Sequence, residues 1–296
     1  MTPVSIIVPS FERIDQTIRT IGLLVPSYAH FELIVSDSTP DASLKLAVAK
    51  AFGDRVIYTR PEKPGIAANK NQGARIARHP ILIFCDSDME VEPEAIGRTV
   101  KFLMDHDNVA AVGGTVLWRG GPNDGKPDRP RPEDRRYEHC GTVYVEAIYS
   151  RYIAIYKEVF LSVGGYDERV FRMRGEGSDL SARLWRAGWP LAYDDSIVVH
   201  HVWDAPDSAA IRVPHPEWGV GRDLLLLAYK YGMLDSSRNN FLRTVAANFP
   251  EESAAIEAFR AEDKPRYPFG FLEVFSDEVL FKQCVSVAAD LLRNLQ

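Results

Sequence analysis

Residues 4–105 alternate short apolar runs with amphipathic stretches, and this alternation constrains the fold more than any other feature of the chain. The runs are rich in Val, Ile and Phe, which is typical of buried strands. They predict strands at residues 4–8, 32–36, 56–59 and 81–85. The stretches between them have helical spacing and predict helices at residues 15–24, 41–51, 66–77 and 93–105. Strands that alternate with helices predict an α/β fold with a mostly parallel, doubly wound sheet.

The pattern changes after residue 108. Strands are predicted at residues 109–116, 142–148 and 152–156, followed by a helix at 178–187 and short strands near Leu191 and Ile197. Residues 119–136 are crowded with Gly, Pro, Arg and Asp and have no periodic apolar face. We expect a long mobile loop there, either a lid over a site or a surface insertion. From Trp218 onward the pattern is helical, with helices predicted at 224–231, 241–249, 253–261 and from 271 to the end.

Composition excludes several classes of function. The chain has 296 residues, of which 46% are hydrophobic and 26% charged, as in an ordinary soluble enzyme. A net charge of −6 argues against nucleic acid as the main partner. Cys85, Cys140 and Cys284 are far apart, so we expect reduced thiols and no disulfide or zinc site. We find no signal-peptide pattern and no apolar stretch near the ~20 residues of a membrane span. We therefore expect a cytoplasmic protein, and leave open a peripheral contact with the inner membrane surface.

Two carboxylates, Asp86 and Asp88, follow the apolar run at residues 81–85 directly. Ligands of open α/β sheets bind outside the carboxyl ends of the strands. An Asp-x-Asp turn can hold a hard divalent cation such as Mg²⁺ or Mn²⁺, and that cation can bind a diphosphate. Alone, the pair would be better explained as an exposed acidic turn that caps the next helix.

Residues at the ends of the neighbouring predicted strands favour a nucleotide site. Phe11 follows the first strand, Asp37 the second, and residues 65–73 the third. Because the carboxyl ends of parallel strands meet at one edge of a sheet, we expect these residues to share a crevice. There Phe11 could stack on a base and Asp37 could hydrogen-bond it. A cation at Asp86 and Asp88 could then reach the diphosphate.

These motifs, in this order, resemble those of the inverting family-2 glycosyltransferases of the GT-A fold, which transfer sugars from nucleotide-diphospho-sugars. The resemblance covers residues 4–201 and is carried by residues 4–11 (VSIIVPSF), 32–37 (ELIVSD), 64–73 (PGIAANKNQG), 86–88 (DSD), 164–168 (GGYDE) and 176–183 (EGSDLSAR). Four positions depart from the family pattern: Glu12 and Pro64 each replace an Asn, Lys70 replaces an Arg, and Gly177 replaces an Asp.

The resemblance implies a mixed, mainly parallel GT-A sheet flanked by helices. It divides the chain into a catalytic domain at 1–205 and a helical C-terminal extension at 206–296. Within the domain, residues 1–108 form the nucleotide-sugar-binding half and 109–205 the acceptor half. The implied nucleotide-binding residues are Pro9, Ser10, Phe11, Glu12, Asp37, Gly65, Lys70, Asn71, Asp86 and Ser87. The implied metal ligands are Asp88 and Asp86, with His200 or His201 from a later strand.

The implied reaction is a single in-line displacement with inversion at the anomeric carbon, in which a carboxylate takes the proton of the acceptor. The family's usual base is an Asp, and this chain has Gly177 in its place. Glu176 and Asp179 remain as candidates. We favour Glu176, because Asp179 would lie in the first turn of the helix, where a carboxylate can serve structure alone.

Aromatic residues near the expected cleft, Trp203 and Trp218, could stack on a sugar ring of the acceptor. The acceptor could be a saccharide, a lipid-linked intermediate or a natural product, and the sequence leaves a homo-oligomer open.

Two other classes of α/β protein fit the pattern less well. A dinucleotide-binding oxidoreductase is disfavoured because no Gly-x-Gly-x-x-Gly follows the first predicted strand. A phosphatase of the haloacid-dehalogenase type would carry its Asp-x-Asp after that strand, whereas here it follows the fourth. One alternative stays open because of Gly177. A chain that keeps the donor site but has lost its base would be a nucleotide-sugar-binding partner subunit.

Overall fold

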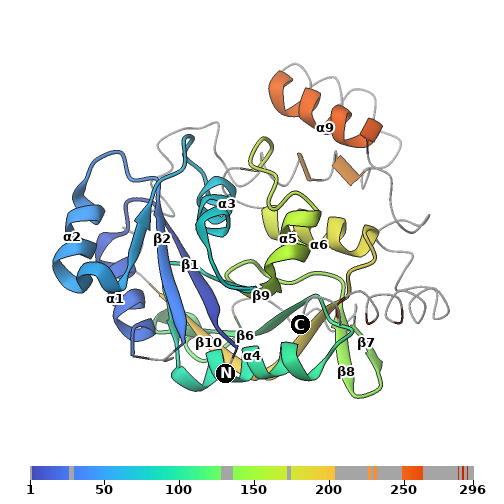
Figure 1. Cartoon of the computed structure of the whole chain (residues 1–296), viewed down its shortest axis with the longest axis horizontal. Coiled ribbons are helices and arrows are strands. Elements are labelled where there is room, and N and C mark those ends of the chain that lie inside the picture. The colour runs from blue at the N-terminus through green and yellow to red at the C-terminus, as the bar shows by residue number, and fades with distance from the viewer. Residues whose placement is uncertain are drawn as a thin grey trace.

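The computed structural model describes residues 2–26, 30–127, 136–171, 175–203, 226–227, 230–231 and 249–262, with single positions at 286, 289 and 292. Its centre is a ten-stranded mixed sheet with strand order β3-β2-β1-β4-β9-β6-β10-β8-β7, in which β5 pairs with β10. Helices cover both faces, with α3, α5 and α6 on one side of the sheet and α4 on the other (Figure 1). The predicted α/β architecture is confirmed.

The first half of the sheet is parallel, as predicted. Strands β1 (Val4–Ser10), β2 (Phe31–Asp37), β3 (Ile57–Thr59) and β4 (Ile81–Cys85) pair in parallel. Every residue of β1 is buried, which explains the lack of polar alternation in its sequence. The intervening helices are α1 (Ile14–Leu24), α2 (Ser43–Phe52), α3 (Ile66–Ile76) and α4 (Pro93–Asp105).

The second half of the sheet is mostly antiparallel, which the alternation of elements did not predict. Strand β9 (Tyr152–Tyr156) lies antiparallel between β4 and β6 (Ala111–Arg119). Strands β5 (Met89–Val91) and β8 (Thr142–Val145) run antiparallel to β10 (Leu191–Val202), and β7 (Arg136–His139) pairs with β8. Only β6 and β10 are parallel here.

Strand β10 corrects the prediction of two short strands near Leu191 and Ile197. It is one strand, interrupted by an irregularity in its pairing with β6 between Asp194 and Val198. A Cβ atom at Gly114 of β6 would lie 2.2 Å from the carbonyl oxygen of Ile197. The glycine therefore allows the irregular backbone to approach β6 closely.

The predicted mobile loop at 119–136 is partly folded. Beyond β6, a 3₁₀ turn (Gly121–Asn123) reverses the chain. The amide of Trp118 donates to the carbonyl of Lys126 at 2.8 Å, and the amide of Gly125 donates back to Trp118 at 2.9 Å. Gly121 has a φ of 69°, a value that a residue with a side chain rarely adopts. Residues 119–127 thus form a closed turn, and 128–135 lie outside the described residues.

Later in the chain the described residues include helices α5 (Lys157–Ser162), α6 (Glu176–Arg186) and α9 (Pro250–Glu262). The last starts earlier than the predicted 253–261, because Pro250 is a favourable first helical residue. Positions 226–227 and 230–231 are helical, as predicted. The predicted helix at 241–249 and most of the one after 271 fall outside the described residues, and the domain boundary at 205 stays a prediction. None of the helices in the described ranges has the length and apolarity needed to cross a bilayer.

Candidate active site

The carboxyl ends of β1, β2 and β4 meet at one edge of the sheet, where the sequence placed the site. The start of α3 is tied to this edge through Asn69, whose side-chain amide donates to the carbonyl of Ser10 at 3.0 Å. The hydroxyl of Ser38 donates to the amide oxygen of Asn69 at 3.0 Å. A Cβ atom at Gly73 would lie 2.4 Å from Ile7, so the glycine lets α3 pack directly on β1. These contacts fix the helix that carries Lys70 and Asn71.

Asp37 lies fully buried at the end of β2. One of its oxygens accepts from the amide and hydroxyl of Thr39, at 2.8 and 2.6 Å, and the other accepts from the hydroxyl of Tyr58 at 2.7 Å. Burial and the neighbouring Asp37 raise the pKa of Tyr58. The sequence did not single out Tyr58, which lies in the short strand β3.

The nearby nucleotide-binding candidates occupy the loop after β1. Pro9 and Ser10 are buried, and Phe11 is half-buried beyond them. Glu12 has a φ of 53°, and its amide donates to Thr39 at 2.9 Å. Gly65 precedes α3 with a φ of 152°. The loop is thus joined to the segment that follows Asp37.

Asp88 lies in the turn between β4 and β5 and is surrounded by basic groups. Its Oδ2 atom accepts from Arg13 and lies 3.2 Å from Nε2 of His201. The guanidinium of Arg151 contacts the ring nitrogens of His201. Burial alone would raise the pKa of Asp88, but the hydrogen bond and charge of His201, with Arg13 and Arg151, lower it. Ser87 is buried, and its carbonyl accepts from Thr20 at 2.9 Å.

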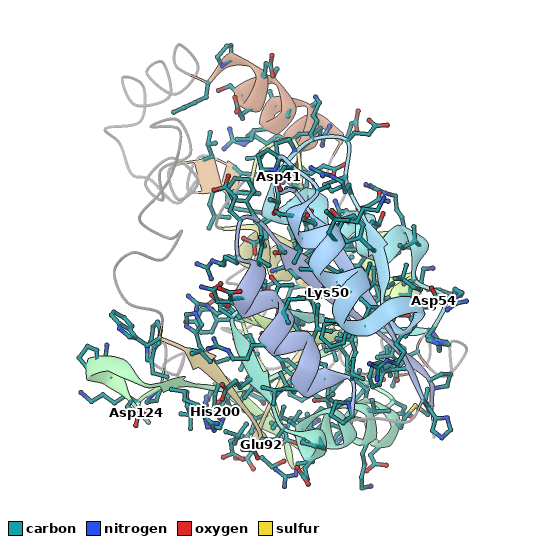
Figure 2. The ribbon with its side chains drawn as sticks, turned by 90° about the vertical axis from the view of Figure 1, so that its left-hand side faces the viewer. Asp41, Lys50, Asp54, Glu92, Asp124 and His200 are labelled. Carbon is teal, nitrogen blue, oxygen red and sulfur yellow. The ribbon has the colours of Figure 1, made fainter. Side chains whose placement is uncertain are left out.

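The two histidines of β10 face opposite ways, as expected of neighbours in a strand. His201 meets Asp88, whereas the ring of His200 lies 3.1 Å from Arg119. His200 is close to Glu92 and to the turn that carries Asp124 (Figure 2). Partial burial and the positive charge of Arg119 lower the pKa of His200. Of the two metal candidates, the structure brings only His201 to the Asp-x-Asp turn.

The donor atoms at Asp88 and His201 fit a divalent cation that also binds phosphate. Among the described residues no group of three or more His, Cys, Asp and Glu side chains could hold a metal ion by itself. Cations such as Mg²⁺ often take only one or two carboxylates and complete their shell with water and substrate phosphates. Oδ1 of Asp86, which lies 3.2 Å from Nζ of Lys70, adds a second carboxylate to this turn. A cation bound at Asp88 would compete with Arg13 for Oδ2.

Lys70 joins the two halves of the site. Its side chain is fully buried, and Nζ donates to the carbonyl of Ser150 at 2.8 Å. The same atom lies 3.2 Å from Asp86 and 3.3 Å from Glu176. Burial would lower the pKa of Lys70, but the two carboxylates outweigh it and raise that pKa. Burial raises the pKa of Asp86, and Lys70 offsets only part of this effect.

The second nucleotide-binding candidate of α3, Asn71, binds backbone instead. Its side-chain amide donates to the carbonyl of Tyr166 at 2.8 Å, and its oxygen accepts from the amide of Tyr166 at 2.9 Å. Asn71 therefore holds the 164–168 segment against α3.

Glu176 is the first residue of α6, two residues earlier than the predicted helix start, and Gly175 before it is left-handed. Its Oε1 atom accepts from the hydroxyl of Ser150 and from Lys70. No contact of Oε2 is seen among the described residues. The neighbouring Gly177 has a physical reason, since a Cβ atom there would lie 2.9 Å from Cβ of Ser150. An Asp at 177 would displace the serine that holds Glu176.

Asp179 is fully buried one turn later in α6. One oxygen accepts from Nε of Arg183 at 2.8 Å and lies 2.7 Å from its Nη2 atom. The other accepts from the hydroxyl of Tyr231 at 2.8 Å and lies 2.7 Å from Nζ of Lys230. Burial would raise the pKa of Asp179, but Arg183 and Lys230 lower it. Both carboxylate oxygens of Asp179 thus accept hydrogen bonds from within the protein, which is a structural role.

An aromatic pair lies beside His201. The ring of Trp118 packs against His201 with centroids 4.3 Å apart, and Trp203 meets Trp118 edge-on at 5.5 Å. Trp203 is 38% exposed. Trp118 was missed because the predicted strand ended at 116, whereas β6 continues to Arg119. Trp218, the other acceptor candidate, lies outside the described residues.

A parallel sheet half with an Asp-x-Asp turn at its carboxyl edge, followed by a mixed half, defines the GT-A class of folds. The chain belongs to glycosyl transferase family 2, whose profile matches residues 5–162. It is 27% identical over 174 residues to the glucosyl-dolichyl phosphate glucuronosyltransferase of Haloferax volcanii, a match covering 55% of each chain. It is 25% identical over 220 residues to N-acetylgalactosaminyltransferase 7 of Drosophila melanogaster, covering 65% of this chain and 37% of that one. The chain therefore spans about half of the first relative and little over a third of the second.

Solved structures agree on the fold. GalNAc-T7 with UDP, GalNAc and Mn²⁺ superposes with a TM-score of 0.70 at 17% identity, covering 95% of this chain and 58% of that one. The mannosyltransferase PcManGT of Pyrobaculum calidifontis, with GDP-Man and Mn²⁺, superposes with a TM-score of 0.56 at 16% identity, covering 98% and 87%. At these identities the likeness shows the GT-A fold alone.

Proposed function

We propose that the chain transfers a sugar from a nucleotide-diphospho-sugar to an acceptor hydroxyl, in a reaction that depends on Mn²⁺ or Mg²⁺. One observation carries this proposal. Buried Lys70 joins Asp86, at the donor edge of the sheet, to Glu176, at the start of α6, with both contacts within 3.3 Å. A phosphate-side carboxylate and an acceptor-side carboxylate thus lie on opposite sides of one ammonium group.

The donor half holds the nucleotide. Phe11 would stack on the base, and the loop of Pro9, Ser10 and Glu12 would line the nucleoside. Asp37, whose oxygens are occupied by Thr39 and Tyr58, would shape the base site as a buried anchor of that loop. Asp88 and His201 would hold the cation, which when bound supplies positive charge to the leaving diphosphate. Arg13 and Arg151 add positive charge beside it.

Glu176 is the base in this proposal. The hydroxyl of Ser150 and Lys70 fix one carboxylate oxygen, which leaves Oε2 for the acceptor. The acceptor hydroxyl gives its proton to Oε2 while its oxygen forms a bond to the anomeric carbon. The bond from that carbon to the diphosphate oxygen breaks on the opposite face, so the configuration inverts. Asp179 has no comparable free oxygen, because both are hydrogen-bonded.

The acceptor side of the proposed site carries an aromatic pair. The exposed ring of Trp203 beside Trp118 favours an acceptor with a sugar ring. We keep a saccharide, a lipid-linked intermediate and a natural product as the acceptor classes. A cytoplasmic location, peripheral contact with a membrane and homo-oligomer formation belong to the same proposal.

Two measurements test the proposal. Thermal shifts with UDP, GDP and TDP, each with and without Mn²⁺, should show one nucleotide that stabilises the chain only with the metal. Proton NMR of the product made from that donor should then show inverted anomeric configuration. Retained configuration would overturn the role of Glu176. Full activity in EDTA would overturn the metal. Binding without transfer or donor hydrolysis would favour the partner-subunit alternative, for which the loss of the usual base at Gly177 is the observation.

A further inference from the structure

A second buried lysine lies behind the candidate active site. The side chain of Lys230 is fully buried, and its Nζ atom lies 2.7 Å from Asp167 and 2.7 Å from Asp179. The ring of Phe259, in α9, lies 4.2 Å from the same nitrogen. One ammonium group from the C-terminal part of the chain therefore sits between two carboxylates of the acceptor half.

Lys230 is the one buried cation of this cluster that pairs with both carboxylates. Asp179 pairs with Arg183 and Lys230, and Asp167 pairs with Lys230 at 2.7 Å and with Arg169 at 3.6 Å. Asp167, Asp179, Arg183 and Lys230 are at most 10% exposed, whereas the side chain of Arg169 is 64% exposed. Without Lys230, Asp167 would keep a longer pair with an exposed arginine, and breaking a buried ion pair by removing one partner is destabilising.

Both carboxylates belong to segments that form the active site. Asp179 lies one turn after Glu176 in α6. Asp167 directly follows Tyr166, whose backbone is held by Asn71 of the helix that carries Lys70. Lys230 thus links the helix of the proposed base to the segment that packs on the donor half. Tyr231 strengthens the link, because its hydroxyl donates to Asp179 at 2.8 Å.

The C-terminal part of the chain contributes more than this lysine. Leu226 and Ile256 are fully buried against Val170 and Phe171, in a small core separate from the main one. The carbonyl of Lys230 accepts from Arg260 of α9 at 3.3 Å. The lysine is therefore held in place by residues on both sides of it in sequence.

We propose that Lys230 is a positioning residue for Glu176, so that the C-terminal extension is a working part of the acceptor half. This inference rests on the proposed function, in which Glu176 is the base. The lysine does not touch the donor site, so its loss should misplace the base and leave donor binding intact. A misplacement of about 1 Å can lower turnover roughly 100-fold.

The test compares Lys230→Met with the double variant Lys230→Met/Asp167→Asn, which removes one charge of each sign. Lys101→Met, on the exposed face of α4, is the matched control. We expect Lys230→Met to lower Tm and to lower kcat about 100-fold. The double variant should recover most of the Tm but little of the kcat, because the link between the two segments is still missing. The KM for the donor and the affinity for its nucleoside diphosphate with Mn²⁺ should stay within about threefold in the double variant.

Hydrogen exchange at residues 176–186 gives a readout that needs no activity. We expect faster exchange there in the double variant than in wild type or Lys101→Met. A double variant with wild-type kcat would overturn the inference, since Lys230 would then supply charge balance alone. Wild-type chain that neither binds a nucleotide nor transfers sugar, while α6 still loosens in the variant, would instead overturn the proposed function. Unchanged exchange and unchanged kcat would overturn the positioning role even if the chain proves to be a transferase.

Discussion

Two buried lysines of this chain each lie between two carboxylates, but the two clusters differ in their exposure to solvent. Lys70 lies between Asp86 and Glu176, and Lys230 lies between Asp167 and Asp179. Around Lys70 the cluster is open to solvent, because the side chain of Asp86 is 23% exposed. Around Lys230 it is closed, and both oxygens of Asp179 are hydrogen-bonded. The same kind of ion pair thus occurs in an open form at the proposed ligand site and in a closed form behind it.

The largest loss of turnover should come from a substitution at the proposed metal site. Asp88→Ala removes the carboxylate that faces His201 and Arg13, and we expect turnover to fall below detection. Nucleoside-diphosphate binding should lose its dependence on Mn²⁺ in calorimetry. Asp124→Ala, an exposed carboxylate near His200, is the control and should keep both properties.

Glu176→Gln should lower kcat by about 10²–10⁴-fold with donor affinity unchanged, since a base contributes to the chemical step. The amide keeps the size of the side chain and can still accept from Ser150. Steady-state kinetics with varied donor and acceptor separate kcat from each KM. Asp179→Asn in parallel should mainly lower Tm. Wild-type turnover in Glu176→Gln, with a large loss in Asp179→Asn, would reverse the roles of the two clusters.

Lys70→Met should destabilise the fold by about 3–5 kcal/mol, because it leaves two buried carboxylates without their shared cation. Unfolding in denaturant measures this change. The turnover lost through Lys70→Met should be much smaller when Glu176 is already Gln, because Lys70 acts through that carboxylate. Additive losses in the double variant would instead assign Lys70 to direct contact with the donor, as the family resemblance implied.

The lowered pKa of Asp179 should make the stability of the fold depend on pH. Its folded-state pKa lies below the usual 3.8, as Arg183 and Lys230 outweigh the burial that would raise it. Its stabilising contribution is therefore present above the unfolded-state pKa and is lost as pH falls through the folded-state pKa. Asp179→Asn should flatten the decline of unfolding free energy below about pH 4, measured by denaturant titration. If the decline of unfolding free energy at low pH is unchanged in Asp179→Asn, other carboxylates cause that decline.

The open cluster could be predicted from sequence far better than the closed one. Asp86 and Asp88 end an apolar strand, so their place at the carboxyl edge follows from local pattern alone. The choice between His200 and His201 could not be made this way. It depends on the irregularity between Asp194 and Val198, and a slip of one residue reverses the faces of a strand.

The partner of Asp179 was beyond sequence reasoning for another reason. Lys230 lies 51 residues beyond it, and helical periodicity predicts a buried face without saying what that face meets. The parallel order of β1, β2 and β4 followed from alternation, but the antiparallel insertion of β9 is a long-range pairing that local pattern does not encode. Gly177 looked like a lost base until its contact with Ser150 gave it a packing reason.

The smallest predicted effect is a rise in the KM for the acceptor, at the exposed ring of Trp203. Trp203→Ala removes an exposed ring that packs edge-on against Trp118, and we expect KM for a sugar-containing acceptor to rise about 3- to 10-fold. Donor KM and Tm should stay near wild type. Leu46→Ala, which trims an apolar side chain that is 67% exposed on α2, is the control. A rise in donor KM instead would mean that the tryptophan pair supports His201, on which Trp118 packs. The pair would then belong to the donor site.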